Sequence, residues 1–67
     1  MSDRQESVTV VYQTETDMAV CVTEEEGGKD VWLPKALINW DRDIDYDRGD
    51  VLEITAPEWL LIRENLL

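Results

Sequence analysis

Short stretches of alternating apolar and polar residues run along most of the chain and predict β-strands. β-branched and aromatic side chains, which favour strands, dominate these stretches. The predicted strands cover residues 8–14, 18–23, 30–33 and 51–56. In the first strand, one face carries Val8, Val10 and Tyr12 by the period of two. In the second strand, one face carries Met18, Val20 and Val22.

Glycine and proline mark the boundaries of the predicted elements. The adjacent Gly27 and Gly28 predict a turn between two strands, because glycine adopts positive φ without strain. Pro34 ends the third strand and begins one helical turn over residues 34–37. Residues 38–40 then resume an extended path.

The end of the chain predicts a short helix. Pro57 stops the last strand and precedes a helical stretch over residues 58–65. Trp59, Ile62 and Leu66 follow a helical spacing and are expected to face the body of the protein. Trp32 and Trp59 are interpreted as core residues rather than as a platform for stacking bases.

These elements predict a mostly β fold. We expect a small curved antiparallel sheet or barrel of four or five strands, closed by a short C-terminal helix. The 67 residues allow a single domain over residues 1–67, in which residues 1–6 are expected to be loosely ordered. An apolar fraction of 43% argues against a disordered chain.

Charge and composition narrow the possible functions. Sixteen Asp and Glu stand against six Lys and Arg, which gives a formal net charge of −10, and the chain has no His. Without an imidazole there is no histidine base, no Ser/His or Cys/His pair and no histidine metal ligand. We therefore expect a protein that is not an enzyme and that uses no cofactor or metal. The summed negative field also disfavours direct binding of nucleic acid and favours a basic protein partner.

The remaining composition indicates a cytoplasmic setting. Cys21 has no second cysteine with which to form an internal disulfide, and it is interpreted as a small apolar strand residue. The longest apolar runs are five residues at 18–22 and four at 59–62, which is too short to span a membrane. No secretory signal is recognised, so a reducing, cytosolic environment is expected.

Alternating aspartates form the most informative local pattern. In an extended strand, Asp41, Asp43, Asp45 and Asp47 would lie on one face about 6.6–6.8 Å apart. Such a row roughly imitates a run of nucleic-acid phosphates and would fit a Lys/Arg groove that binds DNA. The alternative interpretation is an acidic, solvated loop that keeps the protein soluble. Asp50, beyond the glycine that closes this segment, is included in the candidate surface.

A calcium loop is a weaker interpretation of the same aspartates. An EF-hand that started at Asp41 would have Asp43 and Asp45 in place. It would then have Tyr46 where glycine is needed and Leu52 where glutamate is needed. The flanks are also predicted strands rather than helices, so no specific calcium site is expected.

Two further features belong to the candidate surface. Glu24, Glu25 and Glu26 precede the glycine turn and form either a second acidic contact or a solvated hairpin tip. Trp40, beside the aspartates, is a candidate anchor in a protein interface, where tryptophan is enriched.

Two blocks of sequence resemble a known pattern. Val-Trp-Leu-Pro-Lys-Ala-Leu-Ile at 31–38 and Gly-Asp-Val-Leu-Glu-Ile-Thr-Ala-Pro-Glu-Trp-Leu at 49–60 resemble the WLPK…GD…PEWL pattern of small β-rich phage and prophage modules. Independently, a tiny acidic chain without catalytic residues looks like phage inhibitors of host defence, including anti-CRISPR proteins. The resemblance implies an origin in a mobile element and inhibition by occupancy.

Two functional hypotheses follow. The first is a DNA-mimicking inhibitor, a monomer or small homo-oligomer, that binds a basic protein or ribonucleoprotein complex of the host. The second is a non-catalytic β-barrel module that scaffolds a phage or bacterial assembly through apolar residues such as Trp40, Leu66 and Leu67. Sensitivity of binding to salt distinguishes the two hypotheses.

Overall fold

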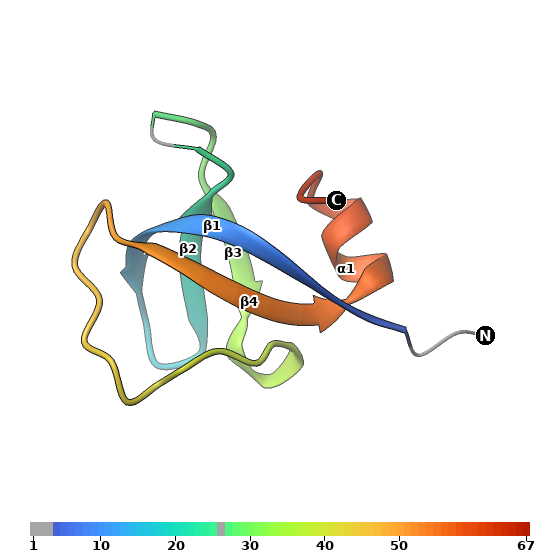
Figure 1. Ribbon diagram of the computed structural model, residues 1–67, viewed down its shortest axis with the longest axis horizontal. Coiled ribbons are helices and arrows are strands. Elements are labelled where there is room, and N and C mark those ends of the chain that lie inside the picture. Colours follow the sequence, from blue (N-terminus) through green and yellow to red (C-terminus); the bar gives the residue numbers. More distant parts are fainter. Residues whose placement is uncertain (1–3, 26) are drawn as a thin grey trace.

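The computed structural model describes residues 4–25 and 27–67, and four strands in these ranges form one antiparallel sheet (Figure 1). Their order across the sheet is β3-β2-β1-β4. A single turn of 3-10 helix, η1, follows β3, and an α-helix, α1, follows β4. The elements are β1 (Gln5–Glu15), β2 (Ala19–Thr23), β3 (Val31–Pro34), η1 (Lys35–Leu37), β4 (Val51–Pro57) and α1 (Glu58–Arg63).

The connectivity makes β1 the centre of the sheet. β1, β2 and β3 follow one another as antiparallel neighbours, and the chain then returns so that β4 pairs with the other side of β1. Asn39 adds an isolated bridge to Thr55 on the outer edge of β4. The prediction of a mostly β fold with a C-terminal helix is confirmed. The barrel alternative is wrong, because the described strands form an open sheet with β3 and β4 at its edges.

One face of the sheet carries the hydrophobic core, and α1 packs against it through its buried Leu60 and Leu61. The predicted alternation of β1 is confirmed, because Val10 and Tyr12 belong to this core and Val8 packs against it. The buried cluster comprises Val10, Tyr12, Val20, Val22, Leu33, Ile38, Leu52, Ile54, Ala56, Leu60, Leu61 and Leu66.

Several residues predicted to face the core are exposed instead. Trp32 lies on the other side of β3 because its neighbour Leu33 takes the core side. Trp59 is 51% exposed and Ile62 is 54% exposed, since α1 turns Leu60 and Leu61 toward the sheet. Of the three residues at the helical spacing that were expected to face the body, Leu66, which follows α1, is buried. Met18, which was predicted to share a face with Val20 and Val22, precedes the first residue of β2 and is 76% exposed, whereas those two are buried.

The first strand begins earlier than the sequence predicts. β1 begins at Gln5, and Gln5 and Glu6 pair with Pro57 and Ala56 of β4. Two of the six residues expected to be loosely ordered are therefore part of the sheet, while residues 1–3 lie outside the described residues. Cys21 is a buried β2 residue, as expected, and burial is the main cause that raises the pKa of its thiol, followed by the negative charge of Asp30.

Candidate partner-binding surface

The aspartates lie on a connection between Asn39 and β4, here called the acidic loop (residues 41–50). At its start, the backbone N–H of Asn39 donates to the Thr55 carbonyl at 2.7 Å. At its end, the Gly49 N–H donates to the carbonyl of Tyr12 at 2.8 Å, and the Tyr12 N–H donates to that of Asp50 at 2.8 Å. Gly49 has a φ of 97°, a conformation that favours glycine. The loop is therefore fixed to the sheet at both ends.

The loop is not the extended strand on which the regular row of carboxylates depends. Its backbone turns at residues 42–44 and 48–49, and no strand is assigned to residues 41–50. The Asp41 carboxylate accepts the Asp43 N–H at 3.0 Å, and the Asp50 carboxylate accepts the Asp47 N–H at 2.8 Å. These short-range hydrogen bonds favour turns over a strand. The prediction of a strand-like spacing along one face is therefore wrong.

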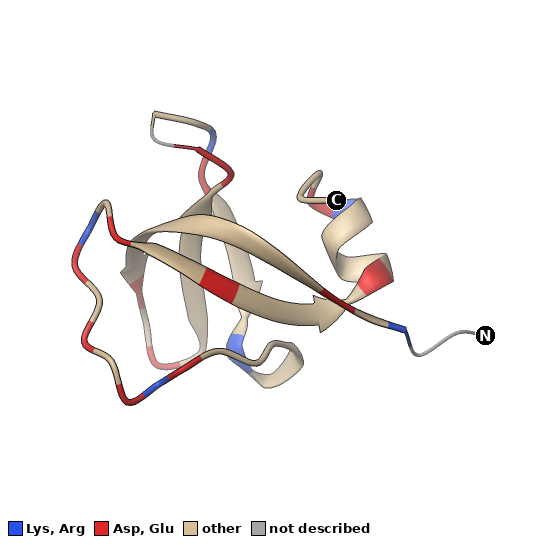
Figure 2. Cartoon of the chain, viewed as in Figure 1, with Lys and Arg blue, Asp and Glu red and all other residues tan. Residues whose placement is uncertain are grey.

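Acidic positions nevertheless follow one another along the loop, with two arginines among them (Figure 2), and all five aspartates are exposed. Within the described part of the chain, the carboxylates of the loop form no ion pair. The two arginines of the loop donate to backbone carbonyls instead. Arg42 donates to the Lys35 carbonyl at 3.0 Å, and Arg48 donates to the Gln13 carbonyl at 3.4 Å. The exposed aspartates of the loop are Asp41, Asp43, Asp45, Asp47 and Asp50.

The second acidic segment lies at the same end of the sheet as the end of the loop. Glu24 and Glu25 are exposed in the connection between β2 and β3, whereas Glu26 lies outside the described residues. Thr23 pairs with Val11, and Val11 pairs with Val51. The backbones that lead into the two acidic segments are thus two strand spacings, about 10 Å, apart.

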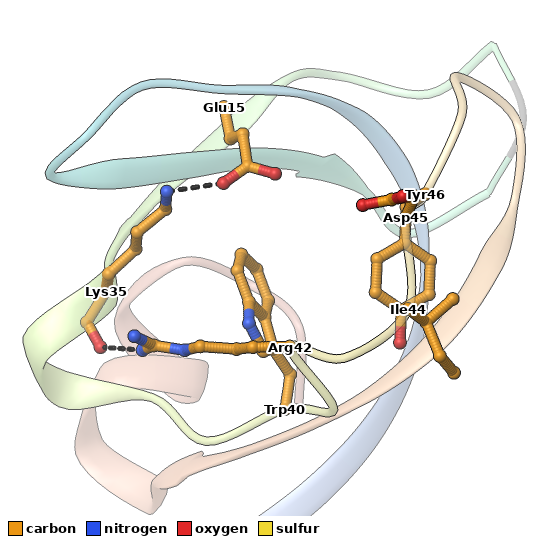
Figure 3. Close-up of a pocket in the computed structure, with 7 residues that line it drawn as sticks. All are labelled: Glu15, Lys35, Trp40, Arg42, Ile44, Asp45 and Tyr46. Carbon is orange, nitrogen blue, oxygen red and sulfur yellow. Dashed lines mark hydrogen bonds and ion pairs between the residues drawn. The ribbon is translucent and has the colours of Figure 1, made fainter.

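A small pocket of about 190 Å³ adjoins the acidic loop (Figure 3). Trp40 and Arg42 line one side of it, and the Arg42 guanidinium lies 5.6 Å from the centre of the Trp40 ring. Tyr46 lines the other side and stacks on Tyr12 with 5.7 Å between ring centres. Trp40 and Tyr46 both pack against the core, so these aromatic rings hold the loop against the sheet.

A short chain of polar contacts adjoins the pocket, and its members Glu15 and Lys35 line it. The Tyr12 hydroxyl donates to Glu15 Oε1 at 2.9 Å, and Lys35 Nζ forms an ion pair with Glu15 Oε2. The hydrogen bond from Lys35 is the main cause that lowers the pKa of Glu15, and the bond from Tyr12 adds to it. The sequence pattern does not predict this triad, because Lys35 lies 20 residues from Glu15 in the chain.

The burial of the Tyr12 phenol leads to a testable prediction about its pKa. Burial, followed by the hydrogen bond to Glu15, raises the pKa of Tyr12 from 10.0 to about 12. The neutral phenol is favoured in the fold, so its contribution to stability is complete below pH 10 and is lost as the pH rises toward 12. In a Tyr46→Phe variant, absorbance near 295 nm reports on Tyr12 alone. A midpoint close to 12 is expected for the folded protein, and a midpoint near 10 would contradict this burial.

Comparisons with known proteins assign no family or function to the chain. No family model matches the chain, and neither does a curated protein or a solved structure. The resemblance to phage modules therefore stays a prediction. Within residues 4–25 and 27–67, no cluster of three or more His, Cys, Asp or Glu side chains is arranged to hold a metal ion. In the same ranges, no helix has the length and apolar character needed to cross a membrane.

Proposed function

We propose that this chain is an acidic inhibitor, made by a phage or another mobile element, that occupies a basic nucleic-acid-binding surface of a host defence complex. The observation that carries the proposal is the acidic loop, whose exposed aspartates have no ion-pair partner in the described residues and whose ends are fixed to the sheet. The inhibitor blocks access of DNA by occupying the same groove. It acts in the host cytoplasm without catalysis.

The mechanism relies on charge density rather than on a regular phosphate-like spacing. Carboxylates that are held close together raise the local negative potential and attract a Lys/Arg groove over a long range. Because the loop is bonded to the sheet at both ends, binding orders less backbone than it would in a free segment. Glu24 and Glu25, at the same end of the sheet as Asp50, extend the negative surface toward the hairpin tip.

Capture from a bacterial lysate tests this proposal. The immobilised protein is exposed to the lysate at low and at high salt, and the bound proteins are identified by mass spectrometry. We expect basic nucleic-acid-binding proteins that are retained at low salt and released at high salt, because screening weakens exposed charge pairs. Recovery of partners that do not bind nucleic acid, with no dependence on salt, would contradict the proposal.

A second candidate function is a scaffold module that binds through an apolar patch. Trp59 and Ile62 are three residues apart on α1, and both are about half exposed. Leu66, which was expected to belong to such an interface, is buried in the core, so of that C-terminal pair only Leu67 is exposed. Under this alternative, binding survives high salt and is lost in a variant with Trp59→Ala and Ile62→Ala.

A further inference from the structure

The pocket beside the acidic loop combines aromatic rings with carboxylates. Figure 3 shows Lys35, Trp40 and Arg42 on one side of the opening, and Ile44, Asp45 and Tyr46 on the other. Glu15 lies above the opening and holds Lys35 through its ion pair. Asp45 is exposed, and within the described residues its carboxylate forms no ion pair and accepts no hydrogen bond, so its charge is available to a ligand.

The pocket already holds one guanidinium. Arg42 comes from the loop itself and lies over the Trp40 ring at 5.6 Å. This contact shows that Trp40 offers a face to a planar cation, as tryptophan does in cation–π interactions. Arg42 is exposed and donates one hydrogen bond, to the carbonyl of Lys35 at 3.0 Å. Such an exposed side chain can be displaced by a competing cation.

The charged residues that line the pocket, Glu15, Lys35, Arg42 and Asp45, balance one another, so the charge of the adjoining loop is what favours a cation over an anion. Residues 41–50 contain five aspartates and two arginines, which gives the loop a net charge of −3. The ammonium of Lys35 is neutralised by Glu15, whose carboxylate stays ionised because the hydrogen bond from Lys35 lowers its pKa. An incoming anion would therefore meet a negative loop and a cation that is already paired.

We infer that this pocket receives an arginine side chain of the partner, which replaces Arg42 over Trp40 and pairs with the carboxylate of Asp45. Arginine fits better than lysine, because its planar guanidinium can stack on an aromatic ring and bind a carboxylate through two parallel hydrogen bonds. This inference rests on the proposed function and names the group of the basic partner that the surface binds most specifically. Arginine and tryptophan are also the residues that most often dominate binding at interfaces.

A peptide titration followed by NMR tests the inference without the partner. The probe is the blocked tripeptide acetyl-Gly-Arg-Gly-amide, and the signal is the indole N–H resonance of each tryptophan. Trp32 and Trp59, both about half exposed, serve as internal controls for nonspecific effects. We expect a saturable shift of the Trp40 resonance that is larger than the shifts of the other two and larger than the shift caused by acetyl-Gly-Lys-Gly-amide. Equal shifts at all three indoles would overturn the inference.

Matched variants sharpen the test. Asp45→Asn is expected to weaken binding of the arginine peptide about two- to fivefold, whereas Asp43→Asn, its exposed neighbour in the loop, changes it less. Arg42→Gln removes the internal competitor and is expected to tighten binding. If Asp45→Asn has no larger effect than Asp43→Asn, or if Arg42→Gln weakens binding, the inferred site is wrong. A failure here leaves salt-dependent capture of basic proteins intact, so it is distinguishable from a failure of the proposed function.

Discussion

Replacement of Leu61 by alanine is expected to unfold most of the protein at room temperature, whereas the same replacement at Ile62 leaves it folded. Leu61 is fully buried between α1 and the sheet, while Ile62 is 54% exposed. A buried Leu→Ala change costs about 2–5 kcal/mol, and a domain of this size has a total stability of only about 3–5 kcal/mol. The exposed change is expected to cost less than about 1 kcal/mol.

Urea unfolding followed by far-UV circular dichroism compares the two variants with the parent protein. Leu61→Ala should lack a folded baseline or show a midpoint far below that of the parent, and Ile62→Ala should keep a midpoint close to it. The pair is well matched, because the two residues are neighbours in one helix and lose side chains of the same size. A larger loss of stability for Ile62→Ala than for Leu61→Ala would mean that α1 presents its other side to the sheet.

The sequence pattern does not decide which side of α1 is buried. The spacing of Trp59, Ile62 and Leu66 favoured one buried side, but α1 has only six residues, so two adjacent sides are almost equally apolar. In the fold, α1 buries Leu60 and Leu61, and a one-dimensional pattern does not contain the orientation of the helix on the sheet. In contrast, the positions of β1, β2, β3 and β4 were predicted to within a few residues, because alternation, glycine and proline define strands locally.

The candidate site was predicted in composition but not in geometry. The exposure of the loop aspartates agrees with the high local charge, which disfavours burial. Their alternation suggested a strand, yet aspartate also accepts hydrogen bonds from nearby backbone N–H groups, as Asp41 and Asp50 do here. The pocket could not be predicted, because it combines Glu15, Trp40 and Tyr46 from positions that only the fold brings together.

Removal of two loop charges is expected to weaken binding to a captured basic partner about tenfold. In this variant, Asp43→Asn and Asp47→Asn change carboxylates that are exposed and have no hydrogen bond or ion pair in the described residues, so the fold is expected to persist. Each exposed charge pair contributes roughly 0.5–1 kcal/mol, and 1.4 kcal/mol corresponds to a tenfold change in affinity. The loss should lie mainly in the association rate and should shrink at high salt.

The matched control changes the same amount of charge elsewhere. Asp17→Asn and Glu53→Gln also remove two exposed carboxylates, from the β1–β2 turn and from β4. Surface plasmon resonance at several salt concentrations compares the two double variants. If only net charge matters, both lose affinity equally, and the acidic loop is then no specific contact. A loss confined to the Asp43 and Asp47 variant supports the loop as the binding surface.

Competition with duplex DNA tests most directly the claim that the protein occupies a DNA-binding groove. The captured partner is bound to a fluorescent DNA duplex at moderate salt, and the unlabelled protein is added while fluorescence anisotropy is recorded. We predict that the protein displaces the DNA completely and that a higher DNA concentration shifts the displacement midpoint in proportion. A ternary complex that keeps the DNA bound at saturating protein would contradict the account.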